Sequence, residues 1–286
     1  MTHQAWTHHE AVINHVRLHY VQAGPEDGPL VVLLHGFPEF WYSWRHQLPA
    51  LAAAGFRVVA PDLRGYNRSE KPPGVAAYRL RQLVADVRAL IVHLGSPTAA
   101  LVGHDWGGVI AWAAAMRHPE VVSRLAILNA PHPGAYRREL RRNPAQWRRS
   151  WYVLAVQLPV VPDALGRLLR VRIGALLRRS SVRPDAFTDE DVRAYIHALG
   201  QPGALTASLN YYRALLRFPG DMPLMPIPAR TLVIWGAQDV ALVPQLSEGL
   251  DRWVPHVQVE RLPQASHWVQ HDAPEVVSRL LIDFLT

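Results

Sequence analysis

The chain has 286 residues, 49% of them hydrophobic, a size that fits a single α/β domain carrying an insertion. It contains no cysteine, which excludes disulfides, thiolate metal sites and a cysteine nucleophile. The net charge of +7 arises in residues 132–224, which contain 15 arginines and 7 acidic residues. Because the chain has no nucleic-acid motif, we interpret these arginines as a solvated helix face and expect no nucleic-acid partner.

The first half of the chain has the pattern of an α/β sheet. Apolar and polar residues alternate over 16–22, and 24–29 has turn composition, which together predict a hairpin at a sheet edge. Three apolar runs that fit strands buried on both faces follow, at residues 30–34, 56–60 and 99–102. Apolar residues recur at helical spacing over 80–94, between the last two runs. This alternation predicts parallel strands with right-handed crossovers.

The second half interrupts the sheet and then resumes it. Residues 132–224 have helical patterns with proline breaks and no strand signal, which predicts a helical lid inserted into the core. Strand patterns return at 231–235 and 257–262, and 274–285 has the pattern of a closing helix. We therefore expect a mostly parallel sheet flanked by helices, with a core formed by residues 1–131 and 225–286 and a lid formed by 132–224.

A strand-to-helix turn at residues 101–108 carries the main chemical signal. The sequence Leu-Val-Gly-His-Asp-Trp-Gly-Gly has the small-x-nucleophile-x-small pattern of a nucleophile elbow, with Asp105 between Gly103 and Gly107. A carboxylate at this position attacks an sp³ carbon and becomes an ester, and the positive end of the following helix favours its ionised form. An ordinary aspartate N-cap is the simpler alternative.

A second loop, His-Gly-Phe-Pro at residues 35–38, follows the strand at 30–34. In the matching hydrolase motif, the backbone N–H groups of Phe37 and Trp106 would form an oxyanion hole. The tetrapeptide alone is equally consistent with a simple turn.

The partners of a nucleophilic triad should follow in the order acid, then base, in loops after later strands. Asp239 follows the strand at 231–235 and His267 follows the strand at 257–262, so we assign them as acid and base. Asn129 is a weaker candidate for the acid, because an amide cannot stabilise an imidazolium by charge.

Several histidines near the N-terminus could suggest a metal, but the positions of His15 and His19 in or beside a hairpin do not bring them onto one helical face. We expect no metal and no cofactor.

Taken together, these residues resemble the epoxide hydrolases of the α/β-hydrolase superfamily over nearly the whole chain. The matching stretches are residues 35–45, residues 61–69, the elbow at 103–108 and the loops of Asp239 and His267. The resemblance implies two lid tyrosines that hydrogen-bond the epoxide oxygen. Tyr152 matches the first, within Tyr-x-x-x-x-Gln, and Tyr212 matches the second, within Leu-Asn-aromatic-Tyr-Arg. Aromatic packing within a helical lid is the alternative for both.

The resemblance implies a small-molecule epoxide as substrate and a two-step reaction through an ester of Asp105. Beside the catalytic loops, we expect His35, Pro38 and Trp268 to contact this substrate. Haloalkane dehalogenases share the aspartate nucleophile and the tryptophan after it, and stay as the alternative activity, although Phe37 stands where they commonly use asparagine. A catalytically idle member of the fold that only binds ligands is the alternative from another class.

Cellular location and assembly complete the expectations. No stretch approaches the roughly 20 apolar residues that span a bilayer, and the first ten residues lack the regions of a signal peptide. We expect a cytoplasmic protein without membrane insertion, either a monomer or a homodimer.

Overall fold

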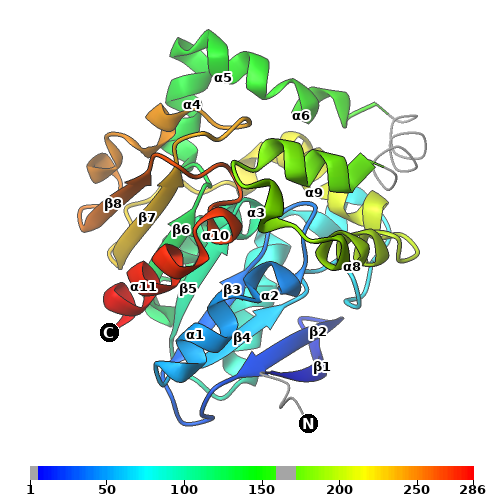
Figure 1. Ribbon diagram of the computed structural model, residues 1–286, viewed down its shortest axis with the longest axis vertical. Helices are drawn as coiled ribbons and strands as arrows, with labels where there is room; N and C mark the ends of the chain where they lie inside the picture. Colours follow the sequence, from blue (N-terminus) through cyan, green and yellow to red (C-terminus); the bar gives the residue numbers. More distant parts are fainter. Residues whose placement is uncertain (1–5, 159–171) are drawn as a thin grey trace.

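The computed structural model describes residues 6–158 and 172–286. Within these residues, an eight-stranded sheet has the strand order β1-β2-β4-β3-β5-β6-β7-β8 (Figure 1). The strands are β1 (Thr7–Ile13), β2 (Val16–Ala23), β3 (Leu30–Leu34), β4 (Arg57–Pro61), β5 (Ala99–His104), β6 (Val122–Leu128), β7 (Arg230–Gly236) and β8 (Val257–Leu262). Pairing is antiparallel for β1 with β2 and β2 with β4, and parallel across the rest of the sheet. The predicted mostly parallel sheet is confirmed.

Strand β3 shows why the central strands consist of unbroken apolar runs. All five of its residues are buried. Leu30, Val32 and Leu34 belong to one apolar cluster, whereas Val31 and Leu33 belong to the other. Because successive side chains of a strand point to opposite faces, each face of the sheet needs its own apolar residues and its own cover.

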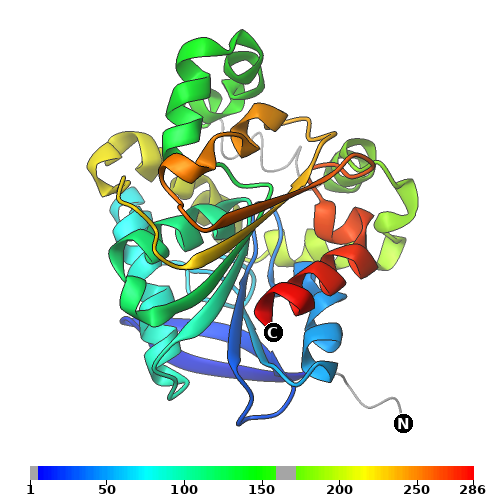
Figure 2. The ribbon, with the colours of Figure 1, turned by 90° about the vertical axis from the view of Figure 1, so that its left-hand side faces the viewer.

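Helices provide that cover on both faces, as the view along the sheet shows (Figure 2). Helix α1 (Gln47–Ala53) packs with α11 (Pro274–Leu285) on one side, and α2 (Leu80–His93) packs with α3 (Trp106–Arg117) on the other. The helices predicted at 80–94 and 274–285 are thus present. The remaining short core helices are η1 (Trp41–Trp44), η2 (Val75–Tyr78), η3 (Pro119–Val121), η6 (Pro244–Ser247), η7 (Leu250–Arg252) and α10 (Val269–Asp272). No helix in either described range is long and apolar enough to cross a membrane.

The predicted edge hairpin was placed wrongly. β2 forms its hairpin with the preceding strand β1, and the turn is made by Asn14 and His15, both with positive φ. Residues 24–29 instead lead into β3, which lies beyond β4 in the sheet. The turn residues are not glycines, and β1 exposes much of its surface, so neither gave a clear signal.

The described residues between β6 and β7 form helices without a strand, and these helices lie over the carboxyl ends of the strands (Figure 1). They are α4 (Pro133–Arg142), α5 (Pro144–Arg149), α6 (Trp151–Ala155), residues 172–180, η4 (Pro184–Ala186), α8 (Asp189–Leu199), α9 (Ala204–Arg217) and η5 (Pro219–Asp221). Local capping explains their boundaries: the Asn143 side chain accepts from the Ala145 N–H at the start of α5, and Thr188 and Asp191 form a capping box on α8.

Candidate active site

Asp105 occupies the sharp turn between β5 and α3. Its φ of 50° and ψ of −119° are unusual for a residue with a side chain, and such strain costs about 1–3 kcal/mol. The turn requires small neighbours: a Cβ on Gly107 would lie 2.1 Å from the Leu34 carbonyl oxygen, and a Cβ on Gly103 would lie 2.4 Å from the Gly107 carbonyl oxygen. The carboxylate makes no N-cap hydrogen bond to α3, which argues against a simple capping role.

The carboxylate of Asp105 meets the loop after β3 on one side. The Phe37 N–H donates to Asp105 Oδ1 over 2.8 Å, so the expected oxyanion donor contacts an oxygen of the expected nucleophile. The other oxygen, Oδ2, lies 3.7 Å from His267 Nε2. The two carboxylate oxygens therefore have different surroundings, one bound by the backbone and the other facing the base.

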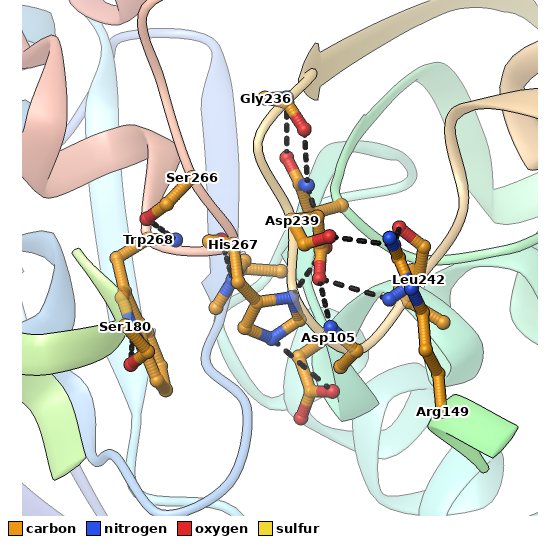
Figure 3. Close-up of polar contacts among 12 residues, drawn as sticks. Asp105, Arg149, Ser180, Gly236, Asp239, Leu242, Ser266, His267 and Trp268 are labelled. Atoms are coloured by element: carbon orange, nitrogen blue, oxygen red, sulfur yellow. Dashed lines mark hydrogen bonds and ion pairs between the residues drawn. The ribbon is translucent and has the colours of Figure 1, made fainter. Parts of the chain in front are cut away.

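Asp239 and His267 come together from the loops after β7 and β8. Asp239 Oδ2 lies 2.7 Å from His267 Nδ1, and the imidazole stands between Asp239 and Asp105 (Figure 3). The Ala241 and Leu242 N–H groups donate to Asp239 Oδ1 over 2.7 and 2.9 Å. The predicted order of nucleophile, acid and base thus corresponds to a continuous chain of contacts.

The environment decides the charges of this pair. Burial by itself would raise the pKa of Asp239, but His267, Asn129 and the Ala241 N–H outweigh it, and the pKa is lowered. For His267, burial acts to lower the pKa, whereas Asp239, Asp105 and Glu39 act to raise it; the result is a pKa of about 9. With Asp105 ionised, His267 is therefore mainly protonated at neutral pH.

Two residues from other segments hold the acid in place. Asn129, after β6, donates its amide N–H to Asp239 Oδ2 over 2.8 Å and accepts from the Gly236 N–H over 2.8 Å. Its side chain therefore supports Asp239, and its hydrogen bonds go to Asp239 and Gly236. Arg149 of α5 donates to the carbonyl oxygens of Asp239 and Leu242 (Figure 3). This part of the arginine-rich segment is therefore bonded to the core, contrary to the expected solvated face.

The two tyrosines reach the same cavity as Asp105. Tyr152 of α6 and Tyr212 of α9 line a cavity of about 230 Å³ with Asp105, and their ring centroids lie 5.8 Å apart. Tyr212 also packs edge-on against Trp106 and Phe37. Burial first, and the nearby Asp105 carboxylate second, raise the pKa of both phenols, which keeps them protonated and able to donate.

The three residues expected to contact substrate are buried supports, and none lines this cavity. His35 has one ring nitrogen 2.9 Å from the Gly36 carbonyl oxygen, and its Nε2 accepts from the Leu63 N–H over 3.0 Å. Pro38 follows Phe37 and is buried. Trp268 packs against His267, and its indole N–H donates to Ser180 Oγ, in the helix at residues 172–180, over 2.7 Å (Figure 3). Their placement favours holding the catalytic loops over contacting a ligand.

A buried carboxylate beside the site was not singled out from the sequence. Glu39, directly after the loop at 35–38, accepts hydrogen bonds from Tyr195, His271 and Gln270, and lies 3.1 Å from His104 Nδ1. Burial alone would raise the pKa of Glu39, but its two histidine neighbours outweigh burial and hold the pKa well below its usual range. Its signals in the sequence were its position directly after the loop at 35–38 and its place in the matching stretch 35–45.

The N-terminal histidines His8 and His19 take part in a chain of hydrogen bonds that ends at Asp62. His19 Nδ1 lies 2.6 Å from Asp62 Oδ2, and His8 Nδ1 lies 2.9 Å from His19 Nε2. Across the described residues, no three side chains of histidine, aspartate or glutamate come together as metal ligands.

Comparison with known proteins shows similarity along nearly the whole chain. A family profile described as "alpha/beta hydrolase fold" matches residues 29–274. The AB hydrolase superfamily protein YfhM of Bacillus subtilis (strain 168) is 43% identical over 281 residues, 95% of each chain. Epoxide hydrolase 2 of Caenorhabditis elegans is 36% identical, over 98% of this chain and 80% of that protein. The crystal structure of an epoxide hydrolase from Bacillus megaterium with an inhibitor superimposes with a TM-score of 0.87 at 36% identity, covering 97% of this chain and 99% of that one.

Proposed function

Since the chain belongs to the epoxide hydrolases of the α/β-hydrolase fold, we propose that it converts an epoxide to a vicinal diol through an ester of Asp105. The observation that carries this mechanism is the contact chain from Asp239 through His267 to Asp105, below a cavity that two protonated phenols also line. Each group has one task in two successive steps.

In the first step, Asp105 Oδ2 attacks a ring carbon and the carbon–oxygen bond of the epoxide breaks. Oδ2 is the attacking atom because Oδ1 is held by the Phe37 N–H. The electron pair of the broken bond goes to the epoxide oxygen, which takes a proton from Tyr152 or Tyr212. The product of this step is a glycol ester of Asp105 and a tyrosinate, which regains its proton from solvent.

In the second step, His267, which has first released its proton to solvent, removes a proton from water with Nε2, and the water oxygen attacks the ester carbonyl carbon. Negative charge develops on Oδ1, where the Phe37 N–H is already 2.8 Å away and the Trp106 N–H at the start of α3 assists. When the intermediate collapses, the diol oxygen leaves with the proton held by His267. The water oxygen stays in the new carboxyl group of Asp105, which becomes a carboxylate by giving its remaining proton to His267.

The lid and the tyrosines favour epoxide opening over release of a halide. An opened epoxide leaves an alkoxide that needs a proton donor, and the cavity offers two phenols for it. The side chain of Phe37 offers no N–H to a departing halide. We propose that residues 132–224 form the lid that brings Tyr152 and Tyr212 over Asp105.

Two measurements test the mechanism. With excess enzyme, a single turnover of styrene oxide in ¹⁸O-water should label Asp105 and leave the diol unlabelled, as read by peptide mass spectrometry. His267→Gln should accumulate an adduct with the mass of one substrate, whereas Asp105→Asn should form none. Label in the diol alone, or no adduct in His267→Gln with a confirmed substrate, would indicate direct attack by water.

A further inference from the structure

The cavity at Asp105 is lined mainly by apolar side chains. Val109 of α3, Leu215 of α9 and Met222 are among the side chains that line it. Asp105, Tyr152 and Tyr212 line the same cavity. Apart from Asp105, the only charged side chain among the described lining residues is Arg137 of α4.

Burial shows that Arg137 stands at the mouth. Trp106 and Tyr212, beside Asp105, are 5% and 7% exposed. Leu216, which also lines the cavity, is 44% exposed, and Arg137 is exposed as well. The cavity therefore runs from a buried catalytic end to an open end that carries a guanidinium group.

The helix directs Arg137 toward the cavity. Pro133, Tyr136 and Arg137 occupy positions i, i+3 and i+4 of α4, which share one face of a helix, and all three line the cavity. Arg138 points elsewhere: it pairs with Glu139 and donates to two carbonyl oxygens of the core. Among the described residues, Arg137 has no hydrogen bond or ion pair of this kind, and it lines the cavity.

From this arrangement we propose that the mouth of the cavity is an anion-binding subsite formed by Arg137, and that the preferred substrate is an epoxide with a terminal oxyanion. An apolar chain would link the oxirane at Asp105 to a carboxylate or phosphate at Arg137. The planar guanidinium donates two parallel N–H groups that match either anion. This inference rests on the proposed epoxide hydrolysis at the same site.

Matched substrates and matched variants test the subsite. The substrates are a medium-chain ω-epoxy carboxylate, its methyl ester and the corresponding ω-epoxyalkyl phosphate. For the native enzyme, KM should be about 5- to 20-fold lower for the anions than for the ester, the range expected of a charge-assisted hydrogen bond at a partly exposed site. Whichever anion gives the lower KM identifies the head group. Salt at about 1 M should remove most of the preference, because the Debye length is then only about 3 Å and interactions between exposed charges are screened.

Arg137→Gln should lose this preference. Arg142→Gln, the same charge change at an exposed position of α4 that does not line the cavity, should keep it. Equal KM values for acid and ester in the native enzyme, or equal losses in both variants, would overturn the subsite.

Binding without turnover separates the two proposals. By titration calorimetry, a medium-chain fatty carboxylate should bind more tightly than the alcohol of the same length, and Arg137→Gln should remove the difference. If that difference is present but no epoxide is hydrolysed, the subsite stands and the proposed function fails. If epoxides are hydrolysed but neither KM nor binding depends on Arg137, the subsite fails and the function stands.

Discussion

Replacing Asp239 by asparagine should separate the two chemical steps. In the structure, Asp239 Oδ2 accepts from both His267 Nδ1 and Asn129, while Oδ1 accepts two backbone N–H groups. In asparagine, the carbonyl oxygen can replace only one of the two carboxylate oxygens, and an NH₂ group takes the place of the other. If the backbone donors hold the carbonyl, the amide faces His267 Nδ1 and favours the tautomer that carries its proton on Nε2. That tautomer cannot take a proton from water.

The expected magnitude follows from the loss of the base. General base catalysis contributes about 10² to 10⁴ in rate, so hydrolysis of the ester should slow by this factor. Formation of the ester needs Asp105 and the tyrosines but no proton acceptor, so it should slow by less than about 10-fold. Rapid-quench kinetics on Asp239→Asn should therefore show a burst of nearly one ester per site, followed by slow turnover.

The matched control is Asp251→Asn, an exposed aspartate on η7, which should behave as the native enzyme. Intact-protein mass spectrometry of quenched samples identifies the species in the burst. The reasoning would be refuted if Asp239→Asn lost the burst and the turnover together while circular dichroism showed a folded protein, because the acid would then be needed for ester formation.

Three further predictions concern other parts of the site. Tyr152→Phe and Tyr212→Phe should each reduce epoxide turnover by about 10- to 100-fold and the double variant should nearly abolish it, with alkyl halide release less affected; near-native diol formation by the double variant would contradict the assignment. The pKa of His267 in the folded protein is raised to about 9, so its protonation should contribute about 3 kcal/mol to the free energy of unfolding. This contribution should be complete below about pH 6.5 and should be lost as the pH rises through 9. Urea unfolding should show the loss in the native protein and not in His267→Gln. Gly107→Ala should destabilise the fold by at least about 2 kcal/mol, since its Cβ would meet the Leu34 backbone, whereas Gly220→Ala, with nothing within 4 Å, should have little effect on thermal unfolding.

The sequence was most informative where one physical constraint dominates. Strand β3 needs apolar side chains on both faces, so its unbroken run was recognisable and its bounds agree with the prediction. The elbow needs Gly103 and Gly107 because the backbone passes too close for a Cβ, and such a requirement is visible as residue type. Strand β1 is largely exposed to solvent and contains the polar residues His8, His9 and Glu10. It therefore lacks the apolar run by which β3 was recognised.

The sequence could not show which way a side chain points or which residues far apart in the chain come into contact. His35 and Trp268 adjoin catalytic residues in the chain, but proximity in sequence does not tell which way a side chain points, and both face inward to hold loops. Glu39 accepts hydrogen bonds from Tyr195 of α8 and His271 of α10, which lie 156 and 232 positions further along the chain. Only folding brings these two residues to Glu39, so no local sequence pattern predicts their hydrogen bonds with it.

The charges of the site also set the order of the two steps. While Asp105 is a carboxylate, it is one of the groups that raise the pKa of His267, so the imidazole holds a proton and cannot yet act as a base. Ester formation removes that negative charge. The pKa of His267 must then fall, because Asp239 and Glu39 remain but Asp105 no longer contributes. In the proposed mechanism, formation of the ester therefore makes it easier for His267 to lose its proton and act as the base.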